Sequence, residues 1–167
     1  WPPEEDIAMS VKGFTDVLSD AITVNIDKEF DIKIASLHGL FVLKFNAWLD
    51  RNIQTNKDAV DMAFILENYF LANLKRDLHP EVYDWDDFDE IVVGAYWLAY
   101  DVVGFLSKEH LSHYNQCLRK EIEKEENSKL LQQIADSSSS FSYEKILLAF
   151  QKMIQVFDKG LCDENPN

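Results

Sequence analysis

AITVNIDKEFDIKIAS fills residues 21–36 and contains two runs in which apolar and polar side chains alternate. Residues 21–26 and 30–35 are rich in β-branched side chains, and the turn-forming residues 27–29 separate them. This pattern predicts a β-hairpin. An isolated two-stranded hairpin is only marginally stable, so we expect it to belong with a larger sheet, although no other convincing strand is found in the sequence.

The remainder of the chain has the periodicity of amphipathic helices. Ser36 and Ser107 stand where helix N-caps are expected, and Gly160 stands where it would end the last helix. One helix is predicted before the hairpin, at residues 6–18. The helices predicted after it span about residues 37–52, 57–74, from 84–89 to 106, 108–136 and 143–159.

These elements predict an α+β fold that is predominantly α, in which a helix and a β-hairpin precede a helical domain. We expect residues 1–36 to form the α/β part and residues 37–160 to form the helical domain. Residues 161–167 are expected to be a flexible tail, because chain termini without buried side chains fray.

The net charge of the chain limits the classes of partner that it can bind. Among 167 residues, 30 are Asp or Glu and 16 are Lys or Arg, which gives a formal net charge of -14. A strong nucleic-acid surface needs clustered basic residues, so this class is excluded, and an anionic membrane surface is disfavoured for the same reason. A strongly acidic domain can face a basic protein partner, although a solvated acidic surface is the simpler interpretation.

The expected location is the cytoplasm. The longest apolar run, residues 91–100, ends at Asp101 and is too short to span a bilayer. The first residues are acidic and lack the apolar stretch of a signal peptide. Two cysteines, Cys117 and Cys162, are too few for a disulfide framework, which favours a reducing compartment.

A cluster of charges lies on two consecutive predicted helices. Lys44 and Arg51 lie two turns apart on one face of the first helix, and Asp58 and Asp61 lie one turn apart on the second. Two cations opposite carboxylates suit the binding of an anion, with the carboxylates orienting the cations or holding Mg²⁺. The alternative is a salt-bridge cluster that joins the two helices and has no ligand.

These charges belong to two longer motifs, KFNAWLDR at residues 44–51 and KDAVD at residues 57–61, which follow the turn SLHG at residues 36–39. In this order they resemble the nucleotidyltransferase family of the abortive-infection toxin type. The resemblance covers about residues 1–75, and residues 76–167 look like a helical extension. It implies a polymerase-β-like fold, of which residues 1–36 would be the remnant of the α/β domain.

The resemblance also implies residue roles in Mg²⁺-dependent transfer of a nucleotidyl group from a nucleoside triphosphate (NTP) to an unknown acceptor. Lys44 matches the lysine that contacts nucleotide phosphates, and Arg51 and Lys57 match accompanying basic positions. Asp58 matches an acidic position with a catalytic or orienting role. Asp61 and Asp50 are further candidates for orienting the cations.

The sequence departs from this family pattern at the metal site. Before the hairpin there is no Gly-Ser turn followed by the D-x-D pair that holds Mg²⁺ in the family. DWD at residues 84–86 and DFD at residues 87–89 have the spacing, but they precede a helix and are expected to cap it. We therefore expect no metal site within this chain, and a D-x-D segment encoded before Trp1.

The missing D-x-D pair keeps a second function open. The alternative is a non-catalytic, acidic helical interaction module, of the antitoxin or immunity type, that binds a basic protein partner.

Two weaker motifs are better explained by structural roles than by ligand binding. His110 and His113 lack a third metal ligand, and the aromatic helix around Trp97 suits core packing better than base stacking.

Overall fold

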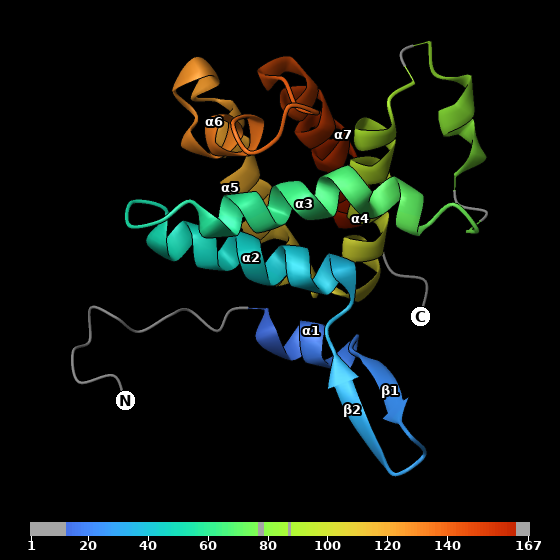
Figure 1. Cartoon of the computed structure of the whole chain (residues 1–167). Coiled ribbons are helices and arrows are strands. Elements are labelled where there is room, and N and C mark those ends of the chain that lie inside the picture. Colours follow the sequence, from blue (N-terminus) through green and yellow to red (C-terminus); the bar gives the residue numbers. More distant parts are fainter. Residues whose placement is uncertain (1–12, 77–78, 87, 163–167) are drawn as a thin grey trace.

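The computed structural model describes residues 13–76, 79–86 and 88–162, and it confirms the α+β, predominantly α fold. Its elements are α1 (Phe14–Ser19), β1 (Ile22–Ile26), β2 (Phe30–Ile34), α2 (Leu37–Arg51), α3 (Lys57–Ala72), the 3₁₀ helix η2 (Pro80–Asp84), α4 (Glu90–Phe105), α5 (Lys108–Ile122), the 3₁₀ helix η3 (Glu125–Asn127), α6 (Lys129–Ala135) and α7 (Tyr143–Cys162). Figure 1 shows the hairpin projecting from a bundle of helices.

The predicted hairpin is confirmed. β1 and β2 pair antiparallel, with Ile22 opposite Ile34 and Ile26 opposite Phe30. The turn between them places Asp27 and Lys28 at φ 51° and 64°, the left-handed conformation that tight hairpin turns require. No third strand joins them within the part of the chain that the structure describes, so apolar side chains of both strands stay exposed.

Three of the helix starts predicted after the hairpin are confirmed by their caps. The Ser36 hydroxyl accepts a hydrogen bond from the Gly39 amide at 3.1 Å, and the Ser107 hydroxyl accepts one from the His110 amide at 3.3 Å. Asp89 accepts from two amides in the first turn of α4, as expected for an acidic cap. Polar side chains that satisfy otherwise unpaired amides fix where these three helices begin.

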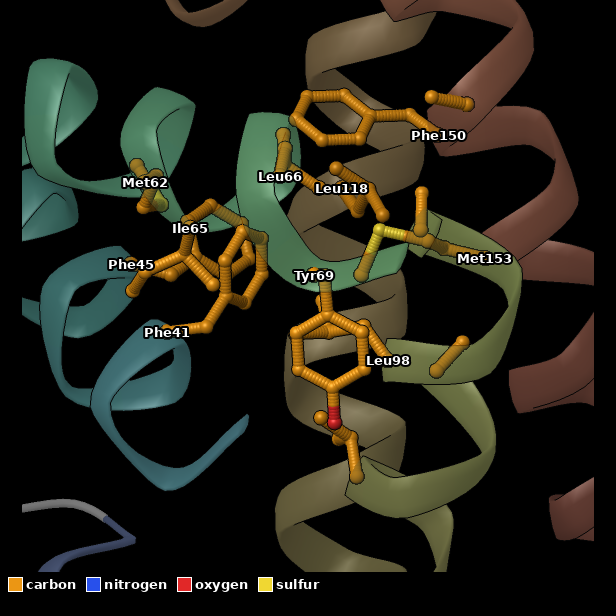
Figure 2. Packing of buried hydrophobic residues seen from close by; sticks show 14 of the residues in the cluster. Phe41, Phe45, Met62, Ile65, Leu66, Tyr69, Leu98, Leu118, Phe150 and Met153 are labelled. Atoms are coloured by element: carbon orange, nitrogen blue, oxygen red, sulfur yellow. The ribbon is translucent and has the colours of Figure 1, made fainter. Parts of the chain in front are cut away.

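The core is centred on α4, which packs against both α3 and α7, while α2 packs against α3 and α5 against α7 (Figure 2). α4 is buried over most of its length, and its Trp97 is fully buried, which confirms the core-packing interpretation of that helix. Gly94 permits the close approach of α3, because a Cβ there would lie 3.0 Å from the Phe70 nitrogen. The apolar helix is therefore the centre of the bundle.

One predicted helix is wrong in its length. The segment 108–136 is two helices, because α5 ends at Ile122 and α6 starts only at Lys129. Ser128 caps α6 by accepting a hydrogen bond from Leu131 N at 3.3 Å, and its hydroxyl donates to Glu121 Oε2 at 3.1 Å. The highly charged stretch between them turns the chain, so the short α6 can bury its leucines against α3 and α7.

The last helix is longer than predicted, because α7 continues through Gly160 to Cys162. Gly160 is therefore a helical residue and does not end the helix. A Cβ on Gly160 would lie 2.6 Å from Val103 Cγ1 on α4, so glycine is required by the close contact of two helices.

Some expectations lie outside the described residues. Residues 163–167 of the expected tail and the first part of the predicted helix 6–18 are among them, although α1 begins at Phe14 within that prediction. The first two residues of the expected tail, 161 and 162, belong instead to α7. The division into domains at residues 36 and 160 stays a prediction. Among the described helices, none has both the length and the apolar character needed to cross a membrane.

Candidate functional site

The predicted charge cluster forms between α2 and α3. A short turn joins these two helices, so the last turn of α2 lies beside the first turn of α3. Arg51 Nε donates to Asp58 Oδ2 at 2.7 Å, and Arg51 Nη2 donates to Asp58 Oδ1 at 2.7 Å. The Asp58 side chain is only 1% exposed, and this bidentate pair satisfies both of its oxygens.

Lys44 extends the same cluster toward solvent. Its Nζ lies 2.6 Å from Asp61 Oδ2 and 3.9 Å from Asp58 Oδ1. The Lys44 side chain is 29% exposed, and its main partner Asp61 is 47% exposed. The structure thus brings together Lys44, Arg51, Asp58 and Asp61, as the helical spacing predicted. In the inner pair, Arg51–Asp58, the carboxylate is buried although Arg51 is 41% exposed, whereas in the outer pair, Lys44–Asp61, both side chains reach water.

The electrostatics of the cluster hold Arg51 in its charged form. The hydrogen bonds to Asp58 raise the pKa of Arg51, burial acts in the opposite direction, and the charges of Asp58, Asp61 and Asp50 raise it further. Two cations therefore stand beside two paired carboxylates, with Asp50 as a further exposed negative charge on α2. Such a cluster joins the helices, and its outer cation is accessible to an anion.

Lys57 lies at the edge of this cluster, as the first residue of α3. Its backbone amide donates to Thr55 Oγ1 at 3.2 Å, and its side chain is exposed. Within the described residues it forms no ion pair with a carboxylate. Lys57 is therefore next to Asp58 in the chain, but the structure does not bring its ammonium group into the paired cluster.

The Mg²⁺ site of the family is not found among these side chains. Within residues 13–76, 79–86 and 88–162, no group of three or more His, Cys, Asp or Glu side chains could hold a metal ion. Asp58 and Asp61 are both committed to cations, and His110 Nδ1 lies 2.7 Å from Asp16 Oδ2. The described residues therefore do not fit a metal.

A second polar cluster lies where the hairpin meets the bundle, and sequence reasoning missed it. Asp20 Oδ2 accepts a hydrogen bond from the Ser36 hydroxyl at 2.5 Å and lies 2.8 Å from His38 Nε2. The other ring nitrogen, His38 Nδ1, lies 3.2 Å from the Tyr69 hydroxyl. Tyr69 in turn donates to Asp101, which completes a chain of contacts from α1 to α4.

Arg76 closes this second cluster. It donates two hydrogen bonds of 2.6 Å to the carboxylate of Asp101. Burial alone would raise the pKa of Asp101, but the hydrogen bonds from Arg76 and Tyr69 and the charge of Arg76 hold it below its usual range. Burial, and then the hydrogen bond to Asp101, raise the pKa of Tyr69. Two sequence signals pointed to this cluster: Asp101, a lone acid after a long apolar run, and the turn SLHG, which contains Ser36 and His38.

Comparison with known protein families found a match, and it covers the residues of both clusters. A family model described as nucleotidyl transferase AbiEii toxin, type IV toxin–antitoxin system, matches residues 2–156. The chain belongs to the AbiEii nucleotidyl transferase toxin family. Comparison with curated proteins found no match, and comparison with solved structures found none either.

Membership of the AbiEii family confirms the resemblance and extends it. The motifs pointed to about residues 1–75, whereas the match continues through α4, α5 and α6 and into α7. The segment from residue 76, expected to be a helical extension, is helical, and the family match covers it as far as residue 156. Most of the helical bundle, including the Asp101 and Arg76 ion pair, lies within the residues that match the AbiEii family.

Proposed function

We propose that the α2–α3 cluster binds the phosphates of an NTP during nucleotidyl transfer to an acceptor hydroxyl. The acceptor hydroxyl oxygen attacks the α-phosphorus and its proton passes to water. The bond from the α-phosphorus to the oxygen that bridges it to the β-phosphorus breaks, and pyrophosphate leaves with that oxygen. The described residues hold no site for the Mg²⁺ that the family implies, and we assign the ion no ligand in this chain. The contribution of this chain is to bind and position phosphates.

The observation that carries this proposal is the difference between the two ion pairs. Lys44 is held by Asp61, which is half exposed, and an ion pair of this kind contributes at most about 1 kcal/mol. A triphosphate oxygen can therefore replace Asp61 as the partner of Lys44 at little cost. Arg51 stays hydrogen-bonded to the buried Asp58 carboxylate during this exchange and keeps α2 and α3 aligned.

This geometry favours particular roles for the other candidates. Asp58 has both oxygens bonded to Arg51 and is buried, so it supports orienting of the cations better than proton transfer. Lys57 is exposed and adds positive charge beside the cluster. Asp61 can release Lys44 when a phosphate binds, and Asp50 is an exposed acid on α2. Both add negative charge beside the cations and so help to orient them.

Equilibrium binding of fluorescent NTP analogues to the purified chain tests the phosphate-binding role. We expect Lys44→Met to weaken binding at least about tenfold, and Lys44→Arg to restore part of it, because the positive charge is what contacts phosphate. Lys33→Met is the matched control, since Lys33 is exposed on β2 of the hairpin and is not part of the α2–α3 cluster. Its affinity should equal that of the wild type.

Transfer assays with labelled NTPs test the reaction class. Incorporation of label from the α-phosphate but not from the γ-phosphate into an RNA, protein or small-molecule acceptor would support nucleotidyl transfer. If no NTP binds to the wild type, or if Lys44→Met binds as tightly as the wild type, the cluster is only a joint between helices. A non-catalytic interaction module would then be the better account of the chain.

A further inference from the structure

A groove between α3 and the start of α4 carries apolar side chains that the fold does not use. Phe64 and Leu71 on α3 are 66% and 54% exposed, and Phe88, just before α4, is 40% exposed. Single exposed apolar residues are normal on protein surfaces. These three line one groove of about 770 Å³, which is large enough to receive several side chains of a partner.

One wall of the groove is held in place by aromatic contacts. The Phe88 ring meets the ring of Phe70 edge-on, with centroids 5.7 Å apart. It also stacks on Tyr83, with centroids 5.8 Å apart. A side chain that is fixed before binding loses little conformational entropy when a partner docks, so Phe88 can serve as a preformed apolar anchor point.

The rim of the groove is negatively charged. Glu67, Asp89 and Glu90 line it, and Lys145 is the cation among its lining residues. Lys145 Nζ lies 3.0 Å from Asp89 Oδ2 and donates to the Ser140 carbonyl at 3.1 Å, so its charge is compensated within the fold. Glu67 and Glu90 remain as two negative charges beside the apolar floor.

The negative charge at the rim of this groove determines which kind of partner fits it. A nucleic acid is repelled by the acids, and a second copy of the chain would bring another net charge of -14. An amphipathic helix with aromatic or aliphatic residues on one face and Lys or Arg beside them matches both features. We propose that the groove binds a basic, amphipathic helical segment of a partner protein.

In this complex, the apolar face of the partner segment lies on Phe64, Leu71 and Phe88, and its cations lie against Glu67 and Glu90. The apolar contact supplies most of the affinity, and the charges supply orientation and a fast association rate. The groove uses none of the residues assigned to phosphate binding, so this inference stands independently of the proposed transfer reaction.

A displayed library of random peptides of about 15 residues, the length at which helices become stable in water, tests the proposal. The library is selected on the wild-type chain, and the selected peptides are then measured for binding to the Phe64→Asp variant. Phe64 is well exposed, so this change leaves the core intact. Ile53→Asp is the matched control, because Ile53 is 85% exposed in the turn between α2 and α3.

We expect the selected peptides to be enriched in Lys and Arg with apolar residues at helical spacing. Phe64→Asp should weaken their binding at least about tenfold and Ile53→Asp should not. The double variant Glu67→Gln, Glu90→Gln should weaken binding severalfold and flatten its dependence on salt. Glu109→Gln, in the first turn of α5, is the matched control for charge and should bind like the wild type.

Three results would overturn the proposal. The first is a selected set without basic enrichment. The second is equal binding by the wild type and Phe64→Asp, and the third is an equal loss of binding in Glu109→Gln and the groove double variant. If the wild type forms a dimer that Phe64→Asp dissociates, the groove is instead a contact between two copies of the chain.

Discussion

Asp58 and Asp61 lie one helical turn apart on α3, and their surroundings give them different energetic roles. Asp58 is 1% exposed and accepts two hydrogen bonds from Arg51, whereas Asp61 is 47% exposed and pairs with Lys44. A buried carboxylate that loses its cation cannot be stabilised by water, but an exposed one can. The inner pair should therefore support the fold, and the outer pair should be free to exchange partners.

Replacing each cation in turn measures this difference. We expect Arg51→Met to lower the free energy of unfolding by about 2–4 kcal/mol, because Asp58 then stays buried without its bidentate partner. Lys44→Met should lower it by less than about 1 kcal/mol, since both members of that pair reach water. Urea denaturation of the two variants at pH 7 provides the measurement. Equal losses would show that burial does not distinguish the two pairs.

The Arg76–Asp101 pair predicts how stability changes with acid. The pKa of Asp101 is lowered in the folded chain, so this carboxylate binds its proton more readily in the unfolded state. It contributes stability above the unfolded pKa of about 4 and loses it as the pH falls through the lower folded value. Arg76→Gln should therefore be destabilised relative to the wild type at pH 6, and this difference should shrink below about pH 4.

The comparison of Arg76→Gln with the wild type at low pH needs a control variant that loses a positive charge elsewhere. Lys33→Gln removes an exposed cation from β2, and its stability difference from the wild type should stay nearly constant over the same pH range. Urea midpoints at several pH values give both curves. A difference between Arg76→Gln and the wild type that does not depend on pH would contradict the assigned role of Arg76.

At this scale the sequence could predict neighbours along one helix or two adjacent helices, and nothing more distant. Lys44 and Arg51 were placed on one face, with Asp58 and Asp61 opposite, because helical spacing and a short turn suffice for that. The contacts of His38 with Asp20 and Tyr69 join α2 to α1 and to α3. They depend on how the elements dock, which no local spacing encodes.

At the scale of elements, glycines mark where helices approach each other. A Cβ on Gly160 would lie 2.6 Å from Val103 Cγ1, whereas a Cβ on Gly104 would have nothing within 4 Å. Both residues lie inside helices, where alanine has the higher intrinsic propensity by about 1 kcal/mol. Packing and propensity therefore oppose each other at Gly160, and only propensity acts at Gly104.

The two alanine substitutions should change stability in opposite directions. We expect Gly160→Ala to destabilise the chain by about 1–3 kcal/mol, because the new methyl group overpacks the contact between α4 and α7. Gly104→Ala should stabilise it by up to about 1 kcal/mol. Thermal unfolding followed by circular dichroism measures both. The double variant Gly160→Ala, Val103→Ala should recover part of the loss, and a failure to recover would point away from this contact.

Sequence patterns predicted elements well where a local signal starts or ends them. The hairpin and the helices capped by Ser36, Asp89 and Ser107 follow from alternation and cap chemistry. The break before α6 was missed although Ser128 is a cap residue, because the charged stretch before it continues the helical pattern. Gly160 was misassigned because a glycine near a helix end fits a terminus and a close contact equally well.

At the scale of the whole molecule, the bundle and the hairpin differ in how they are held. The bundle has a continuous apolar core shared by α2 to α7, whereas Ile22, Phe30, Ile32 and Ile34 of the hairpin are all exposed. α1 lies between these extremes. Its Val17 is buried against the bundle, so we expect α1 to resist local unfolding better than the hairpin does.

Native-state hydrogen exchange, followed by mass spectrometry, measures this gradient. We expect amides of β1 and β2 to exchange through local openings at least about 2 kcal/mol below global unfolding, because few buried contacts oppose their separation. Amides of α3, α4 and α7 should exchange only through global unfolding. α1 should follow the bundle, since Asp16 accepts hydrogen bonds from the Ser107 amide and lies 2.7 Å from His110 Nδ1. The predicted domain boundary at residue 36 would then separate only the hairpin, whereas uniform protection from α1 to α7 would mean one cooperative unit with no boundary there.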